Sequence, residues 1–411
     1  MARIVQKFGG TSVGDIARIR NVAKRVKAEI DQGNEVAVVV SAMSGVTNQL
    51  VAYCNEMAPL HDAREYDAIV ATGEQVTSGL LAIALQEMGI SARSWAGWQI
   101  PIITDDAHGK ARIAEIKGDA IIASMKQGHV AVVAGFQGLG PDGRVSTLGR
   151  GGSDTTAVAL AAAVKADRCD IYTDVDGVYT TDPRIVKTAR KLNKITYEEM
   201  LESASLGAKV LQTRSVEMAM KHRVRVQVLS SFTDENAPPA SALPGTLVCD
   251  EEEIVEKELV SGIAYSRDEA KVTLTGVSDR PGIAAGVFGP LSEANINVDM
   301  IVQNTSHDGT TDITFTCSRT ELDRALKVLK DVKVECKEIA TDKSVVKVSV
   351  IGVGMRSHAG VAQTMFKALA DKGINIHVIS TSEIKVSVLI GEEYTELALR
   401  ALHTAYGLDA A

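Results

Sequence analysis

Residues 3–14 have the sequence RIVQKFGGTSVG, in which an apolar strand runs directly into a glycine-rich turn. A helix is expected to begin near Asp15, directly after this turn. Strands that are buried on both faces and separated by helices predict a three-layer α/β domain with a mainly parallel central sheet. Further apolar stretches that alternate with helical patterns lie at residues 35–41, 130–135, 170–173 and 224–229.

The α/β pattern fails after residue 231, which predicts a domain boundary. Residues 234–245, DENAPPASALPG, are rich in turn-forming residues, and residues 251–258, EEEIVEKE, form a charge run without an apolar face. We therefore assign residues 1–231 to the first domain and expect residues 232–258 to be a linker.

The rest of the chain contains an internal repeat. Residues 272–304 begin VTLTGVSDRPGIAAGVF, and residues 346–382 begin VKVSVIGVGMRSHAGVA. Gly360 follows Gly282 by 78 residues, and Asn375 follows Asn297 by the same distance. Each copy has the pattern of a strand, a turn, a helix and a second strand that opens with an Ile-Asn pair. A third strand and a second helix follow, which is the ferredoxin-like βαββαβ order.

The two copies are not complete in the same way. The first copy, residues 267–341, has a final strand, whereas the second lacks one strand before the sequence ends. Residues 259–266 form a spare strand-like stretch just before the first copy. We therefore expect the second unit to consist of residues 259–266 plus 342–411, with the first unit inserted within it.

The composition favours a globular protein with small-molecule partners. A length of 411 residues exceeds what one hydrophobic core usually supports, and 45% apolar with 23% charged residues is close to the average of globular proteins. The net charge of −8 argues against a nucleic acid or an anionic membrane surface as the main partner.

The sequence gives no sign of targeting or of disulfide bonds. Its first residues lack a long apolar segment followed by a small-residue cleavage site, so no signal peptide is expected, and no apolar run approaches the length of a membrane span. The five cysteines are scattered and form no CxxC pair, which predicts reduced thiols in the cytoplasm.

The turn at residues 7–14, KFGGTSVG, has the features of a phosphate-binding site. Glycines allow the backbone to approach a ligand closely, and the free N–H groups at a helix start favour an anion. It is not a Walker A loop, because Asp15 stands where that motif needs its lysine. A glycine-rich turn with a purely structural role is the alternative.

A second glycine-rich segment, residues 148–154, has the sequence LGRGGSD. Asp154 occupies a position where the dinucleotide fingerprint GxGxxG needs glycine. A phosphoryl-transfer site explains the mixture better, since the glycine N–H groups and Arg150 can hold anionic oxygens while Asp154 orients a lysine. The alternative is that Ser153 and Asp154 only cap the following helix.

Residues 172–184, YTDVDGVYTTDPR, combine a strand end with a polar turn. The acidic residues do not form an EF-hand, because Gly177 arrives too early for that pattern. Contacts with the ribose and base of a nucleotide suit this segment, although from these residues alone a plain surface turn is the better explanation. The histidines show no HExxH spacing, so protein-bound zinc is not expected.

Six segments occur in the order found in aspartate kinases, which belong to the amino-acid kinase family and end in tandem ACT domains. They are KFGGTSVG, SAMSGVTN, ATGEQ, TLGRGGSDTTA, YTDVDGVYTTDPR and GAKVLQTRSVE. The chain resembles this family over essentially its whole length. The resemblance implies an amino-acid-kinase-like α/β domain followed by two ferredoxin-like ACT domains.

The resemblance also implies roles for individual residues. Lys7 and Lys209 would offset charge on the transferred phosphoryl group, and Asp154 would organise these lysines. Arg150 would pair with a carboxylate of the substrate. The implied ATP contacts are Lys7, Phe8, Gly9, Gly10, Ser41, Thr173, Asp174, Tyr179, Asp182, Arg184 and Lys209, and the implied aspartate contacts are Thr47, Glu74, Arg150, Gly151 and Gly152.

The implied reaction is phosphorylation of the L-aspartate side chain by ATP, with Mg²⁺ held mainly by the phosphates rather than by protein ligands. A kinase for another carboxylate or carbamate and a catalytically inactive amino-acid sensor are the alternatives. The presence of Lys7 and Asp154 disfavours the second of these.

The paired ACT units imply regulation and assembly. Feedback by lysine together with threonine is expected, as is a homo-oligomer, a dimer or a tetramer, because an isolated ferredoxin-like unit exposes a sheet edge. The turn after the first strand of each unit meets the Ile-Asn start of its second strand, and effectors are expected there. The residues concerned are Asp279, Gly282, Ile283, Asn297 and Gln303 in the first unit and Gly360, Val361, Asn375, Ile376 and Thr381 in the second.

Overall fold

The computed structural model describes residues 2–207, 210–232, 245–254, 258–305, 309–332, 334–358 and 360–409. They form two compact units. The first comprises Met1–Val178, Lys191–Ala204 and Lys209–Glu256, and the second comprises Tyr179–Arg190, Ser205–Ala208 and Lys257–Ala411.

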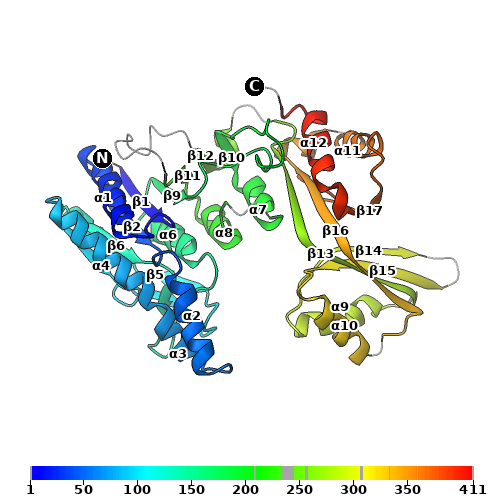
Figure 1. The fold of residues 1–411 in the computed structure, drawn as a ribbon, viewed down its shortest axis with the longest axis horizontal. Helices are drawn as coiled ribbons and strands as arrows, with labels where there is room; N and C mark the ends of the chain where they lie inside the picture. Colours follow the sequence, from blue (N-terminus) through cyan, green and yellow to red (C-terminus); the bar gives the residue numbers. More distant parts are fainter. Residues whose placement is uncertain are drawn as a thin grey trace. The chain divides into compact units, whose positions relative to one another are not determined.

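An eight-stranded sheet forms the centre of the first unit (Figure 1), in the order β10-β12-β11-β9-β1-β2-β6-β3. All neighbouring strands are parallel except β11 and β12, which confirms the predicted mainly parallel sheet. The strands are β1 (Arg3–Phe8), β2 (Glu35–Val40), β3 (Ala92–Trp95), β6 (Val130–Ala134), β9 (Arg168–Thr173), β10 (Lys194–Thr196), β11 (Val226–Ser230) and β12 (Thr246–Cys249).

Helices cover both faces of this sheet, because successive side chains of its strands point to opposite sides. Phe8 and Val38 pack with helices α1 (Ile16–Asp31) and α4 (Thr72–Glu87). Val5 and Val39 pack with the other set, which consists of α5 (Asp119–Lys126), α6 (Gly152–Ala163) and α8 (Thr213–His222). The three-layer prediction is therefore confirmed.

A small four-stranded sheet, in the order β5-β4-β7-β8, leads into the second glycine-rich segment. Its last strand, β8 (Val145–Thr147), ends directly before Leu148, and helix α3 (Ala63–Val70) packs against it. The remaining elements here are α2 (Val46–Met57), β4 (Ile102–Thr104), β5 (Ile113–Ile116), β7 (Gln137–Leu139) and α7 (Tyr197–Ser205).

Helices α3 and α4 together form the stretch Ala63–Glu87, which is long and apolar enough to cross a membrane. Half of its most apolar window is buried in the folded chain. Asp67 and Glu74, both buried, lie within it. These features are typical of a core helix.

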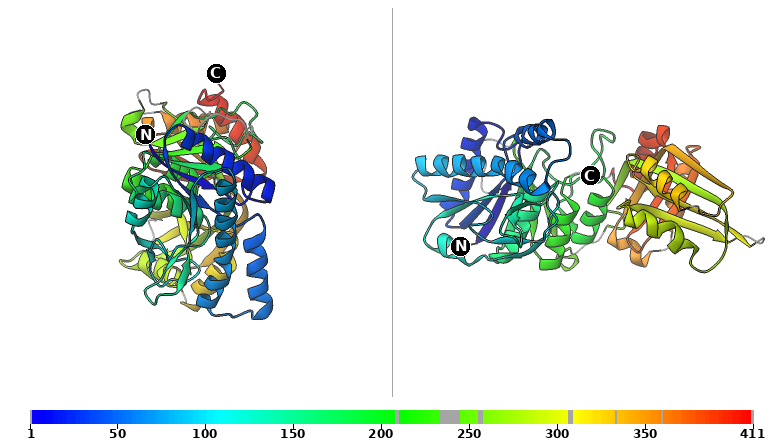
Figure 2. Two further views of the ribbon diagram at one scale, coloured as in Figure 1. Left: turned by 90° about the vertical axis from the view of Figure 1, so that its left-hand side faces the viewer. Right: turned by 90° about the horizontal axis from the view of Figure 1, so that it is seen from below.

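A six-stranded antiparallel sheet forms the second unit, in the order β14-β15-β13-β16-β18-β17. Its two central strands, β13 (Gly262–Ser278) and β16 (Glu338–Ile351), are long and run side by side through the unit (Figure 2). The other strands are β14 (Val298–Thr305), β15 (Thr310–Cys317), β17 (Ile376–Thr381) and β18 (Lys385–Gly391), and the helices are α9 (Ile283–Glu293), α10 (Leu322–Asp331), α11 (Val361–Ala370) and α12 (Thr395–Ala405).

Each half of this sheet has its own hydrophobic core, and a small buried cluster joins β14 of one half to β16, β17 and β18 of the other. One core packs α9 and α10 on β13 and β15, and the other packs α11 and α12 on β16 and β18. Residues 262–266, within the stretch expected to complete the second ACT unit, pair with residues 347–351. The two predicted ACT units therefore share one continuous sheet.

The predicted domain boundaries differ from the structure in two places. The linker expected over residues 232–258 contains β12, whose Val248 and Cys249 are buried in the large sheet. Residues 179–190, expected in the first domain, group with the second unit, because Val186 packs into its core and Ile263 N–H donates to the carbonyl of Thr180 at 2.7 Å. The five cysteines are free, and Cys336 is the half-buried one among four buried thiols.

Candidate active site

The carboxyl ends of four neighbouring strands meet at one edge of the large sheet. Phe8 at the end of β1 pairs with Val40 of β2 and with Tyr172 of β9, and Tyr172 pairs with Leu229 of β11. The turns after these strands are therefore brought together, as the fold class predicts. The amide of Ser41 donates to the carbonyl of Phe8 at 3.1 Å, which joins two of these turns.

Lys7 forms a buried ion pair at this edge. Its Nζ lies 2.6 Å from Oδ1 of Asp154, in the first turn of α6, and both side chains are only 11% exposed. Among the described residues, Asp154 Oδ1 accepts no hydrogen bond, so the ammonium approaches it outside hydrogen-bonding geometry. The predicted contact of these two residues is present, and the pair can engage a further charged group.

The first glycine-rich turn packs closely on its surroundings. A Cβ on Gly9 would lie 3.2 Å from Lys7 Nζ, and a Cβ on Gly10 would lie 3.1 Å from the carbonyl oxygen of Ala42. Glycine at these positions lets the Lys7 ammonium and the turn after β2 lie close to the backbone of the first glycine-rich turn. The Phe8 ring is fully buried and stacks on Tyr172, so only backbone atoms of Phe8 remain for a nucleotide.

Glu74 is a buried carboxylate beside the turn after β2. Its Oε1 accepts a hydrogen bond from the amide of Ala42 at 3.1 Å, and its Oε2 has no hydrogen-bond partner among the described residues. Burial raises the pKa of Glu74 to about 7. Thr47, also predicted to contact aspartate, lies in the first turn of α2 after this turn.

The second glycine-rich segment forms a tight loop into α6. Gly149 and Gly151 have φ values of +74° and +70°, in the left-handed region that favours glycine. A Cβ on Gly151 would lie 1.9 Å from Cγ of Gln212, which excludes any larger residue. Arg150 lies between them with an exposed side chain, and the helix begins at Gly152.

The predicted nucleotide residues fall in different parts of the chain. Thr173 and Asp174 lie at the end of β9, beside β1. Tyr179, Asp182 and Arg184 belong to the second unit, where Asp182 accepts hydrogen bonds from Arg184 and from the Tyr265 hydroxyl at 3.2 Å.

The pairing of Asp182 with Arg184 holds the pKa of Asp182 below its usual range. Lys209 lies outside the described residues. A nucleotide contact by any of these residues stays a prediction.

Two residues that were not singled out from the sequence support the second glycine-rich loop. Asp67 on α3 is fully buried and accepts hydrogen bonds from Thr147, and Arg214 on α8 donates to the carbonyl of Leu148. Asp67 lies outside the six segments that resemble the family, and Arg214 lies within GAKVLQTRSVE without an assigned role; each acts on backbone that is distant in sequence.

The predicted effector residues lie at equivalent places in the two halves of the second unit. Gly282 and Gly360 have φ values of +90° and +102° and are the N-caps of α9 and α11. Asn297 and Asn375 are exposed just before β14 and β17. The repeat therefore has a structural counterpart, while effector binding stays a prediction.

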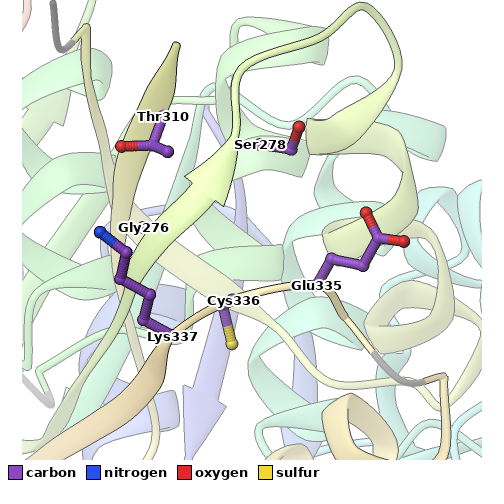
Figure 3. Close-up of a pocket in the computed structure, with 6 residues that line it drawn as sticks. All are labelled: Gly276, Ser278, Thr310, Glu335, Cys336 and Lys337. Carbon is purple, nitrogen blue, oxygen red and sulfur yellow. The ribbon is translucent and has the colours of Figure 1, made fainter. Parts of the chain in front are cut away.

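A surface pocket of about 330 Å³ lies near the first of these places (Figure 3). It is formed at the end of β13, the start of β15 and the segment before β16. It adjoins Asp279 in sequence but includes none of the predicted effector residues. Its lining consists of Gly276, Ser278, Thr310, Glu335, Cys336 and Lys337.

Comparisons with known proteins agree with this architecture. The amino acid kinase family model matches residues 2–230, and ACT domain models match residues 271–334 and 348–406. The aspartate kinase of Pseudomonas putida is 57% identical over 100% of this chain and 98% of that protein.

Two solved structures of Escherichia coli aspartokinase III are also similar. The complex with aspartate and ADP has a TM-score of 0.80 and 29% identity, covering 98% of this chain and 99% of that chain. The complex with lysine and aspartate has a TM-score of 0.75 and 28% identity, covering 98% of each chain. With a family model that matches more than half of its length and a full-length relative at 57% identity, the chain belongs to the amino acid kinase family and, within it, to the aspartate kinases.

Proposed function

We propose that this protein transfers the γ-phosphoryl group of ATP to the side-chain carboxylate of L-aspartate, forming 4-phospho-L-aspartate and ADP. The observation that carries the proposal is the buried Lys7–Asp154 ion pair at the carboxyl edge of the parallel sheet. It lies between two glycine-rich turns, and Asp154 Oδ1 has no hydrogen-bond partner in the part of the chain that the structure describes. The similar aspartokinase III has been solved with aspartate and ADP.

The chemistry needs no general base. A carboxylate is already ionised at neutral pH, so it can attack the γ-phosphorus in line without losing a proton. The new bond joins a carboxylate oxygen to phosphorus, while the bond from phosphorus to the β,γ-bridging oxygen breaks and ADP leaves. Catalysis then rests on positioning and on stabilising charge on the transferred group, which is the role of the Lys7 ammonium.

The substrate would be held by charges of both signs. The exposed Arg150 guanidinium can pair with a carboxylate of aspartate, and the free Oε2 of Glu74 can accept from its ammonium group. Because the pKa of Glu74 is raised to about 7, binding of the ammonium would favour the ionised form and release a proton.

Magnesium would be held chiefly by the phosphates of ATP. Among the described residues, no three histidine, cysteine, aspartate or glutamate side chains converge as a metal site. When bound, Mg²⁺ would neutralise phosphate charge, as it does in other kinases.

A coupled assay of ADP release tests the reaction. Aspartate should support turnover, and hydroxylamine should trap the acyl phosphate as a hydroxamate. Glutamate, carbamate and uridylate serve as the comparison panel, because kinases for these substrates share the first domain. Turnover with one of these and none with aspartate would overturn the assignment.

We further propose feedback inhibition by lysine together with threonine. The supporting observations are the two equivalent glycine-capped helices in the second unit and the lysine complex of the similar aspartokinase III. Effectors that bind a less active state more tightly by about 1–3 kcal/mol would change affinity several-fold to about a hundredfold. We expect weak inhibition by either amino acid alone and strong inhibition by both.

Titration of lysine and threonine, separately and together, tests this regulation. Gln303→Ala should abolish the joint inhibition, since Gln303 is exposed on β14 at the predicted site. Asn304→Ala is the matched control, because the next residue of a strand faces the opposite side of the sheet. Activity that stays unchanged when both amino acids are present at millimolar concentration would exclude the proposed regulation. It would leave the proposed kinase activity untouched.

Assembly into a dimer or tetramer is proposed through the sheet of the second unit. Strands β14 and β17 end the order of the sheet and contact each other within the chain, and they carry the exposed apolar side chains Ile301 and Ile379. Exposed apolar side chains favour contact with another chain. Light scattering at micromolar concentration should show a dimer or larger even-numbered species, and an active monomer would contradict the proposal.

A further inference from the structure

The loop that presents Arg150 begins at a buried anchor. Thr147 and Leu148 are fully buried, whereas Arg150, two residues later, is exposed. The amide of Leu148 donates to the carbonyl of Phe136 at 2.9 Å, which fixes the start of the loop on its inner side. The position of the Arg150 guanidinium therefore depends on how the backbone of residues 147–149 is held.

Asp67 holds Thr147 from one side. Its carboxylate accepts hydrogen bonds from the amide of Thr147 at 3.0 Å and from the Thr147 hydroxyl at 2.5 Å. It also accepts from the amide of Gly109 at 3.1 Å and contacts Nδ1 of His108 at 2.7 Å. A fully buried carboxylate thus joins β8 to the loop after β4, and every contact is to a hydrogen-bond donor or a histidine nitrogen.

Arg214 holds Leu148, the residue after Thr147, from another side. Its Nη1 donates to the carbonyl of Leu148 at 2.6 Å, and its Nη2 donates to the carbonyl of Ala111 at 2.9 Å. The amide of Ala111 in turn donates to the carbonyl of Thr147 at 2.9 Å. The guanidinium therefore bridges the same two segments that Asp67 joins.

The glycines of the loop rest on these two supports. A Cβ on Gly149 would lie 3.2 Å from the carbonyl oxygen of Gly109, a residue that Asp67 binds. Gly151 lies against the side chain of Gln212, which caps the helix that carries Arg214. Both flanks of Arg150 are thereby fixed to backbone that Asp67 and Arg214 hold.

We propose that Asp67 and Arg214 are positioning residues for the aspartate substrate, because together they set the place and direction of Arg150. The inference rests on the proposed function of the loop. Neither residue needs to touch the substrate. A displacement of about 1 Å in a substrate-binding group is enough to weaken its interactions strongly. Loss of either support should therefore act on aspartate binding more than on nucleotide binding.

Asp67→Asn is the first test, since it keeps the size of the side chain but places an amide group against donors. We expect the KM for aspartate to rise by about 10-fold or more, with the KM for ATP changed by less than about 2-fold. A merely structural role would lower the amount of active enzyme, and thus kcat, without this separation of the two KM values.

Glu199→Gln provides the matched control. Glu199 is another buried carboxylate of the first unit, and it accepts from both the amide and the hydroxyl of Thr196, as Asp67 does from Thr147. It lies on α7, far in sequence from the 148–152 loop, and both of these hydrogen bonds go to Thr196. Its removal should lower thermal stability and leave both KM values unchanged.

Arg214→Met and Arg214→Lys provide the second, independent test. Arg214→Met should raise the KM for aspartate as Asp67→Asn does, while Arg214→Lys, which can still donate to one carbonyl, should recover part of the loss. Unchanged KM values for aspartate in folded Asp67→Asn and Arg214→Met would overturn the inference. If the wild-type protein itself fails to phosphorylate aspartate, the proposed function fails instead, so the two failures are distinguishable.

Discussion

Two buried lysines in this protein form ion pairs with different numbers of carboxylates. Among the described residues, Lys7 in the first unit contacts one carboxylate, that of Asp154, outside hydrogen-bonding geometry. Lys347 in the middle of β16 lies 2.5 Å from Oε1 of Glu269 and 2.6 Å from Oδ2 of Asp299. Their side chains are similarly buried, at 11% and 6% exposed.

The difference indicates which charge is structural and which is available for a ligand. Lys347 lies between strands on both sides and contacts two carboxylates, of which that of Asp299 accepts a hydrogen bond from it. Lys7 lies at a strand end beside Gly9, where a third charged group can approach. A buried charge is costly unless it is compensated, so incomplete compensation at a ligand edge favours a functional role.

The largest effect is expected from Lys7→Ala. If the ammonium stabilises charge that develops in the transition state, kcat should fall by about 100-fold or more while the fold is retained. Circular dichroism and steady-state kinetics of the purified variant check this. A folded variant with near-normal kcat would show that Lys7 has no catalytic role and does not differ from Lys347 in this respect.

A smaller loss is expected from Asp154→Asn. The substitution removes the charge that orients Lys7 but leaves the lysine in place, so kcat should fall by about 10-fold with little change in the KM for ATP. Kinetics at saturating aspartate measure it. A change confined to the KM for ATP would show that Asp154 acts on nucleotide affinity instead.

Glu74 extends the comparison to a buried carboxylate that also has an unpaired atom. Its pKa in the folded chain is about 7, above the ordinary value of 4.5, so the folded state keeps a proton that the unfolded chain releases between these pH values. The stability of the wild type should therefore fall as the pH rises across this window.

Glu74→Gln cannot titrate and should be more stable than the wild type at about pH 8, by up to about 3 kcal/mol, with little difference at about pH 4. Its KM for aspartate should rise by about 10-fold at neutral pH if the carboxylate binds the substrate ammonium. Thermal unfolding at both pH values and steady-state kinetics test the two parts. A stability difference that does not depend on pH would exclude titration of Glu74.

The smallest effect on turnover is expected from Lys347→Met. The uninhibited kcat should stay unchanged, while the unfolding free energy should fall by about 3 kcal/mol, since the change leaves Glu269 buried without its partner. Denaturant unfolding, followed by far-UV circular dichroism, measures the loss. Glu269→Gln combined with Lys347→Met should recover part of it, and an equal loss in the double variant would contradict the ion-pair explanation.

The pairing of Lys347 also predicts a loss of stability in acid. Lys347 holds the pKa of Asp299 below its ordinary value of 3.8. Asp299 therefore stabilises the fold above the pKa of the unfolded chain, and this contribution is lost as the pH falls through the pKa of the folded state. The pKa of Lys347 is raised, so its own contribution is lost only as the pH rises above the ordinary value of 10.5.

Much of the fold was predictable because it depends on local patterns. Buried strands and glycine-rich turns are visible in short stretches, so β1, β2, β6, β9 and β11 begin and end within a few residues of their predicted bounds. The repeat of Gly282 and Gly360 likewise predicted two equivalent helix starts. The contact of Lys7 with Asp154 followed from the resemblance of both motifs to the family.

Other features depend on which distant segments meet. In the sequence, residues 179–190 follow the strand and polar turn of the first unit. Their apolar side chains nevertheless pack in the core of the second unit. Nothing near Asp67 or Arg214 marks them as supports of the 148–152 loop, since their partners lie far away along the chain.

Local patterns in the sequence are enough to predict the parallel sheet, the repeated ferredoxin-like units and the two glycine-rich turns, because periodicity and glycine placement are local properties of the chain. Tertiary contacts place two carboxylates beside Lys347 and, among the described residues, one beside Lys7. They also bring buried Asp67 and half-buried Arg214 to the loop of Arg150. The number of carboxylates near a lysine and the contacts that hold a loop depend on distances between segments that are far apart in the sequence. A local sequence pattern gives no information on these distances.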